Sequence, residues 1–173
     1  MINIKIVRRF LKESEIMLLM EDIKLYPDLV YIKKELFKKL KKTYVVEVNK
    51  KLAGICGIYE IEDWVKLGPL IFLKKNHGKG YGKILLSRIA SDYLGKKLFI
   101  TSSNIAVQKI VSKLNFQEIE SYFNLPIKIK LFLIKQLFEY FHWKLIVEFF
   151  RKKFTMKRNK RMYYIKTAEE RLG

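Results

Sequence analysis

Apolar residues in this chain switch between helical spacing and strand spacing from one segment to the next. They recur three or four positions apart in some segments and form β-branched or aromatic runs in others, with breaks at glycine, proline and asparagine. The spacing predicts, in chain order, a strand at residues 2–7, two helices within 11–40, a hairpin of strands at 43–48 and 52–61, a strand at 64–73, a helix at 84–93, a strand at 97–101, a helix at 104–114, a strand at 116–122, a mostly helical segment at 126–153 and a last strand at 161–166. That order predicts an α/β (α+β) domain with a mixed sheet and a helical insertion before its last strand.

Length, charge and cysteine content narrow the class of protein further. With 173 residues, 50% of them hydrophobic, the chain is expected to form one globular domain over residues 1–173. Its formal net charge of +19 leaves two interpretations open, a lysine-rich solvated surface or an acidic partner. The lone Cys56 cannot form a disulfide within the chain and is expected to be a buried, inert thiol, which suits a reducing compartment.

No segment of the sequence predicts membrane insertion across a bilayer. Basic residues interrupt the apolar residues of the N-terminal stretch, so no signal peptide is expected. The most apolar stretch, residues 131–150, contains lysine, glutamate and histidine at intervals, which excludes a transmembrane helix. We therefore expect a cytoplasmic protein.

The strand predicted at residues 64–73 leads into the most informative local pattern. Proline lacks the N–H that a regular ladder needs, so Gly68-Pro69 is expected to bulge or splay this strand. Three alternating glycines follow in His77-Gly78-Lys79-Gly80-Tyr81-Gly82, and then a helix begins. Such an arrangement presents free main-chain N–H groups to an anion, and the lysines around the loop favour a pyrophosphate. A glycine-rich run by itself is equally typical of a turn.

Two common phosphate-binding loops are excluded by their spacing. A P-loop needs a glycine five residues before its Gly-Lys pair and a Ser or Thr after it, whereas His77 and Ile84 occupy these positions. The dinucleotide fingerprint needs G-x-G-x-x-G early in a βαβ unit, whereas this chain has G-x-G-x-G after a run of antiparallel strands.

Residues 104–116 form a second segment in which a capped helix leads into a strand. Together with residues 77–82, this segment resembles the GNAT superfamily of acetyl-CoA-dependent N-acyltransferases. The family's first motif, Gln/Arg-x-x-Gly-x-Gly/Ala, is matched except at its first position, where His77 stands. The second motif is matched at Asn104, Lys113, Leu114 and Phe116, while Asn115 replaces a glycine and can adopt the same left-handed geometry. The resemblance covers roughly residues 45–122 and implies a GNAT-like, mostly antiparallel sheet.

The resemblance implies that acetyl-CoA is the cosubstrate. In the family, main-chain groups of the splayed strand bind pantetheine and polarise the thioester, and amides of the glycine loop bind the pyrophosphate. The residues that this assigns to cofactor binding are Ile71, Phe72, Leu73, His77, Gly78, Lys79, Gly80, Tyr81, Gly82, Lys83 and Asn104.

The resemblance also reveals departures at both usual catalytic positions. The frequent general base, a Glu in the splayed strand, is replaced by Lys66, and the frequent general acid, a Tyr, is replaced by Val111. Loss of general base catalysis slows a reaction by about 10²–10⁴-fold without abolishing it. Other groups could therefore serve, and the candidates are Glu60, Glu62, Asp63, Ser102, Ser103 and Ser112. Each of these also has an ordinary structural interpretation, as a solvated turn carboxylate or a helix cap.

Two hypotheses about function follow. The leading one is an N-acetyltransferase that moves an acetyl group from acetyl-CoA to a primary amine of an unidentified acceptor. The alternative is an acyl-CoA-binding or RNA-associated module of GNAT type with little or no turnover, which Lys66 and Val111 favour.

The insertion at residues 124–160 is apolar and aromatic, and it becomes basic toward its end. One or two helices are predicted over 126–150, and their apolar surface is wider than one packing face requires. Extra core, a homodimer interface, a hydrophobic acceptor pocket and a membrane-surface helix all stay open. The basic residues at 151–161 fit a nucleic acid, an acidic acceptor or a solvated face. With one other histidine in the chain, His142 supports no metal site.

Overall fold

A seven-stranded sheet in the order β1-β2-β3-β4-β5-β7-β6 organises the described part of the chain. A computed structural model of the protein describes residues 2–26, 32–40, 42–141, 147, 150 and 159–168. The strands are β1 (Ile4–Arg8), β2 (Lys42–Val48), β3 (Lys51–Ile61), β4 (Trp64–Phe72), β5 (Lys97–Ser102), β6 (Gln117–Ile119) and β7 (Met162–Lys166). The helices are α1 (Glu13–Ile23), α2 (Lys34–Lys38), α3 (Tyr81–Asp92), α4 (Ile105–Lys113) and α5 (Ile127–Tyr140).

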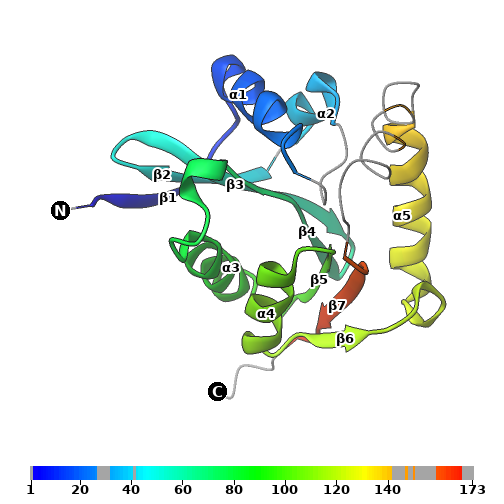
Figure 1. The fold of residues 1–173 in the computed structure, drawn as a ribbon. Helices are drawn as coiled ribbons and strands as arrows, with labels where there is room; N and C mark the ends of the chain where they lie inside the picture. Colours follow the sequence, from blue (N-terminus) through cyan, green and yellow to red (C-terminus); the bar gives the residue numbers. More distant parts are fainter. Residues whose placement is uncertain are drawn as a thin grey trace.

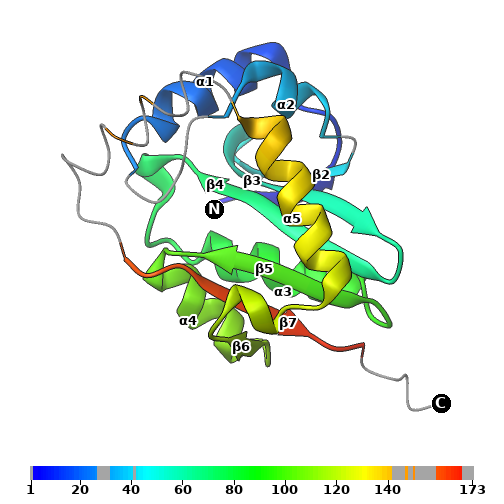
Figure 2. The same cartoon turned by 90° about the vertical axis from the view of Figure 1, so that its right-hand side faces the viewer.

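Helices cover both faces of this mixed sheet. Neighbouring strands are antiparallel except for β4 and β5, which run parallel. Helices α3 and α4 lie on one face, whereas α1, α2 and α5 lie on the other (Figures 1 and 2). The order of strands and helices confirms the mixed, mostly antiparallel α/β class that the sequence predicts, with α5 placed between the last two strands.

Of the predicted elements, the strand expected at residues 116–122 differs most from the structure. Strand β6 covers only Gln117–Ile119, because the side chain of Ser121 accepts a hydrogen bond from the N–H of Phe123 at 3.3 Å and starts a 3-10 turn at Tyr122–Asn124. Helix α5 confirms the predicted helix as far as Tyr140. Residues 142–146 of the predicted helical segment, which include His142, and the basic residues 151–158 lie outside the described residues.

The predicted hairpin of β2 and β3 is confirmed, together with its turn. Asn49 and Lys50 have φ values of 50° and 64°, the left-handed geometry that two-residue hairpin loops require. The side-chain oxygen of Asn49 accepts a hydrogen bond from the N–H of Asn3 at 3.0 Å. This bond ties the turn to the chain just before β1.

The divergence of β4 from β5 is the feature of the fold that creates the site. Strand β4 pairs with β5 only from Trp64 to Leu67, although both strands continue further. On its other edge, β4 pairs with β3 as far as Phe72, with a register shift opposite Gly68-Pro69. The predicted bulge and splay are therefore confirmed, and β4 keeps one edge open over its second half.

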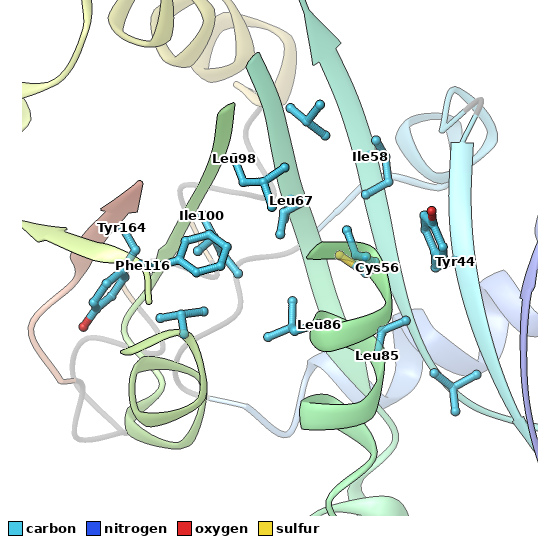
Figure 3. Packing of buried hydrophobic residues seen from close by; sticks show 14 of the residues in the cluster. Tyr44, Cys56, Ile58, Leu67, Leu85, Leu86, Leu98, Ile100, Phe116 and Tyr164 are labelled. Carbon is cyan, nitrogen blue, oxygen red and sulfur yellow. The ribbon is translucent and has the colours of Figure 1, made fainter. Parts of the chain in front are cut away.

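Three clusters of buried apolar residues hold the layers together. Leu85, Leu86 and Ile89 of α3 pack on the sheet against residues such as Cys56 and Leu67, as Figure 3 shows for part of this cluster. A second cluster lies under α1 and α2, and a third lies between α5, β4 and β5. The packing on both faces fixes the positions of β4 and α3, which form the walls of the site.

Helix α5 buries one side and exposes the other. Ile129 is buried in the third cluster, and Leu133 packs against it. The apolar residues that α5 and its C-terminal end expose are Ile127, Leu131, Ile134, Leu137, Phe138 and Phe141, here called the α5 stripe. Among the described residues, no helix has both the length and the apolar character needed to cross a bilayer. The residues of the α5 stripe are thus exposed, and Ile134 and Leu137 among them line the cavity described below.

Candidate functional site

A cavity of about 1060 Å³ lies where β4 and β5 diverge. Its walls include the glycine loop and α4 from one side of the sheet, and α5 from the other side. In Figure 2, α5 crosses in front of the sheet while α3 and α4 lie behind it, so the cavity spans both faces through the gap in strand pairing. Ligand pockets are typically about 300–1,000 Å³, so this cavity is at the large end of that range.

The glycine loop presents main-chain donors to this cavity. Within the described residues, the N–H groups of residues 78–82 donate to no main-chain acceptor. Gly78 and Gly80 have φ values of 73° and 78°, and a Cβ at either position would meet nothing within 4 Å. Gly80 is the N-cap of α3, so the positive end of the helix dipole and the Lys83 side chain act at the same place. These groups suit a pyrophosphate.

The residues of β4 that the sequence assigned to cofactor binding differ in which edge of the strand they face. The N–H of Leu73 donates to the carbonyl oxygen of Ala53 at 3.0 Å. Because N–H groups alternate in direction along a strand, those of Ile71 and Leu73 face β3, whereas those of Leu70 and Phe72 face the open edge. Ile71 and Leu73 lie in the core, and of the three predicted strand residues only Phe72 lines the cavity. Leu70, absent from the sequence prediction, lines it as well.

His77 anchors the glycine loop to the end of β4. Its Nε2 lies 2.8 Å from the carbonyl oxygen of Phe72, so Nε2–H donates to that carbonyl. Its ring stacks on Tyr26 with centroids 5.0 Å apart, and the Tyr26 hydroxyl donates to Asp22 at 2.9 Å. His77 lines the cavity, and its Nε2 is already bonded to the main chain of β4. The structure thus gives His77 a positioning role for the loop.

The second GNAT-like segment supplies another wall of the cavity. The side-chain oxygen of Asn104 accepts hydrogen bonds from the N–H groups of Ala106 at 2.9 Å and Val107 at 3.3 Å, which caps α4 as the sequence predicts. Asn115 has a φ of 60°, the left-handed geometry expected of the residue that replaces a glycine. Asn104 and Val107 both line the cavity, so the cap holds α4 at the site.

Replacing Asn104 tests whether the cap positions this wall. Asn104→Ala is expected to lower the free energy of unfolding by about 1 kcal/mol, because two N–H groups lose their acceptor, and to weaken acetyl-CoA binding as the start of α4 loosens. Asn104→Ser can still accept from the same N–H groups and should recover both properties. Chemical denaturation and calorimetric titration measure the two effects. A serine variant as impaired as the alanine variant would contradict a capping role.

The carboxylates proposed from the sequence as general bases lie outside the cavity wall. Glu60 forms an ion pair with Lys42 at 2.6 Å, and this hydrogen bond lowers the pKa of the Glu60 carboxyl. Glu62 forms an ion pair with Lys128 of α5. Neither glutamate is among the described residues that line the cavity. The structure therefore does not bring them together with the glycine loop.

Of the serines proposed from the sequence as candidates on and before α4, some line the cavity and one does not. Ser112 is exposed and is not among the described residues that line the cavity, and its hydroxyl donates to the carbonyl oxygen of Gln108 at 3.0 Å. Val111, at the family's usual tyrosine position, is fully buried. Ser102 and Ser103 do line the cavity, and the Ser103 hydroxyl is buried without a hydrogen-bond partner in the described structure.

Positive charge dominates the cavity. The described lining contains no Asp or Glu, and its cationic residues are Lys66, Lys83, Lys109 and Arg161. Lys66 is the most buried of the chain's described lysines, with 6% of its surface exposed. The sequence indicated Lys66 only as a departure from the family motif. Within the described residues, no group of three or more potential metal ligands occurs.

Solved structures with a similar fold include several acetyltransferases. N-acetylglutamate synthase from Neisseria gonorrhoeae, complexed with coenzyme A and N-acetyl-glutamate, aligns with a TM-score of 0.65 and 15% identity, over 96% of this chain and 36% of that one. The ribosomal-protein-S18-alanine N-acetyltransferase from Escherichia coli aligns with a TM-score of 0.60 and 15% identity, over 100% and 99%. A GNAT family acetyltransferase from Elizabethkingia anophelis with acetyl-CoA bound gives 0.58 and 16%, over 96% and 99%.

These likenesses are ones of fold. The chain spans about a third of the length of the Neisseria gonorrhoeae synthase and almost the full length of the other two proteins. Comparison with curated protein sequences finds no match. A family model described as Acetyltransferase (GNAT) family matches residues 9–116, which is more than half of the chain and includes β4, the glycine loop and α4. The chain therefore belongs to the GNAT family of acetyltransferases.

Proposed function

We propose that this protein transfers an acetyl group from acetyl-CoA to a primary amine. The observation that supports this most directly is the run of free N–H groups at residues 78–82, at the start of α3 and inside a cavity that reaches the open edge of β4. With the pyrophosphate on this loop and the pantetheine arm along Leu70 and Phe72, the thioester would lie between β4 and β5. Space for an amine then remains on the side of α5.

In this proposal, the chain's own groups orient the thioester and stabilise developing charge. The amine nitrogen attacks the thioester carbonyl carbon, the C–N bond forms, and a main-chain N–H on the open edge of β4 stabilises the oxyanion. Such a donor is worth about 3 kcal/mol in other acyl-transfer enzymes. The C–S bond then breaks and the thiolate leaves, helped by a thiol pKa of about 8.5. The proton that the attacking nitrogen loses passes to the thiolate, which gives the amide and free coenzyme A. Because the described lining holds no carboxylate, we infer that the ammonium loses its proton to water before attack.

The competing candidate is an acyl-CoA-binding module with little turnover. The buried Val111 at the usual acid position and the absence of a carboxylate from the described lining favour it. Calorimetric titration with acetyl-CoA, followed by an assay of thiol release with a panel of amines, separates the two. We expect binding and amine-dependent thiol release. Tight binding with no release for any amine would favour the module, and no binding of any acyl-CoA would contradict both.

The cellular setting that fits this proposal is the cytoplasm. Cys56 is a free thiol in the core, and burial raises its pKa to about 12, so it stays neutral. A free buried thiol and no disulfide among the described residues fit a protein of a reducing compartment.

Homodimerisation through the α5 stripe stays a prediction from the sequence. Phe138 and Phe141 expose 76% and 60% of their surface, so replacing both with Ser removes no core contact. We expect the double variant to keep the thermal midpoint and the acetyl-CoA affinity of the parent protein, while light scattering shows a dimeric parent and a monomeric variant. A strictly monomeric parent protein would contradict the prediction.

A further inference from the structure

Lys66 is a buried cation with unused capacity to bind an anion. Its side chain lines the cavity with 6% of the residue exposed, and no ion pair among the described residues includes it. Its Nζ lies 5.2 Å from the ring centroid of Tyr59 and 6.0 Å from that of Phe132, contacts that stabilise an ammonium in part. An unpaired buried charge is costly, and a bound anion would remove much of that cost.

The ammonium of Lys66 lies on the opposite face of the sheet from the glycine loop. Val65 and Leu67 pack toward α3 and α4, whereas Trp64 packs toward α5, so the alternation of β4 directs Lys66 toward α5 as well. Phe132 of α5, beside its Nζ, agrees with this direction. Nζ also lies 3.7 Å from the place that a Cβ of residue 68 would take, at the bulge where β4 leaves β5. Lys66 is thus on the α5 side of the sheet, where the proposed function places the acceptor amine.

A second unpaired donor lies on the same face. Lys66 is paired with Phe99 in the sheet, and Thr101 is the next residue of β5 that points the same way. The Thr101 hydroxyl is buried with no hydrogen-bond partner in the described structure, and Thr101 lines the cavity. An ammonium and a hydroxyl can each donate a hydrogen bond to a carboxylate oxygen.

The charge state of Lys66 at neutral pH agrees with anion binding. Burial lowers its pKa to about 8, and the positive charge of Arg161, also at the cavity, acts in the same direction. A group with that pKa is still about 90% protonated at pH 7. A bound carboxylate would raise the pKa of Lys66 again. Binding of the carboxylate and protonation of Lys66 therefore strengthen each other.

We propose, on the basis of the proposed acetyl transfer, that the acceptor is an amine carrying a carboxylate, and that Lys66 and Thr101 bind this carboxylate. The wall that α5 adds to the same half of the cavity includes Leu133, Ile134 and Leu137. An apolar body between the wall and the sheet therefore suits the acceptor, as in an amino acid with an apolar side chain. Specificity arises because an uncharged analogue leaves Lys66 without its anion.

Matched acceptors with and without the charge test this proposal. Leucine and phenylalanine are expected to be acetylated with a kcat/KM about 30-fold or more above that of leucinamide and phenylalaninamide, equivalent to about 2 kcal/mol. Lys66→Met keeps the length of the side chain and removes the charge. It should abolish this preference, mainly through a higher KM for the amino acids, while the acetyl-CoA affinity is retained and the thermal midpoint is equal or higher, because a costly buried charge is removed. Lys96→Met, at an exposed lysine just before β5, should keep the preference.

Binding measurements separate this proposal from the proposed transfer. Calorimetric titration of the protein loaded with coenzyme A should show N-acetylleucine binding to the parent protein, but neither N-acetylleucinamide binding to it nor N-acetylleucine binding to Lys66→Met. That pattern, without acetylation of any amine, would reject the transfer and keep the anion site. Equal acetylation of amino acids and amides by the parent protein would overturn the site. So would an equal loss of kcat with both acceptor types in Lys66→Met, which would place Lys66 in proton transfer.

Discussion

Gly80→Asp is expected to lower the affinity for acetyl-CoA by at least about 100-fold, because it puts a carboxylate where the pyrophosphate is proposed to bind. Two unit charges about 4 Å apart repel each other by about 4 kcal/mol at an effective dielectric constant of 20. The backbone also has a φ of 78° at Gly80, and the strain of a side chain there adds about 1–2 kcal/mol to the cost of folding. Steric overlap does not contribute, since a Cβ at this position would meet nothing within 4 Å.

Gly95 provides the matched control for Gly80→Asp. It has a φ of 85° and the same open surroundings, but it lies in the turn between α3 and β5, away from the cavity. Gly95→Asp should therefore reproduce the loss of stability and leave the affinity unchanged. Thermal unfolding measures the stability of both variants, and calorimetric titration measures their affinity for acetyl-CoA. If both lost affinity equally, backbone strain rather than charge would be responsible, and the assignment of the loop to phosphate would fail.

Gly54→Ala is expected to destabilise the protein and to weaken acetyl-CoA binding at the same time. A Cβ at Gly54 would lie 2.6 Å from Cε1 and 2.7 Å from Cγ of Phe72, distances that real side chains do not tolerate. The ring of Phe72, which lines the cavity, would have to move. Overpacking of this kind costs about 1–3 kcal/mol, and the displaced ring would disturb the open edge of β4.

A double-mutant cycle with Phe72→Ala isolates this contact. Without the ring, an alanine at position 54 has nothing to displace, so Gly54→Ala should cost much less in the Phe72→Ala background than in the parent protein. Urea unfolding gives the four free energies, and titration with acetyl-CoA gives the affinities. Additive costs in the two backgrounds would show that Gly54 acts through the backbone of β3 and not through Phe72.

Features that depend on near neighbours in the chain were predictable from the sequence. The hairpin turn at Asn49-Lys50, the bulge at Gly68-Pro69, the glycine loop at residues 77–82 and the Asn104 cap are each formed by a few consecutive residues. Backbone geometry and local hydrogen bonds determine these structures, so the residue types already specify them. The two GNAT motifs are of this kind, and the structure has a glycine loop before α3 and a capped α4 at the positions that they predict.

The identity of the groups that face the cavity was decided only by the tertiary structure. Sequence spacing placed Ile71 and Leu73 beside Phe72, but the pairing of β4 with β3 turns their N–H groups away from the open edge. Contacts between distant segments determine the rest. Glu62 is an ion-pair partner of Lys128 on α5, and the buried Nζ of Lys66 lies near the rings of Tyr59 on β3 and Phe132 on α5. The sequence thus determined where the glycine loop forms, whereas the packing of α5 on the sheet determined which charged side chains line the cavity, because burial and pairing depend on residues far apart in the chain.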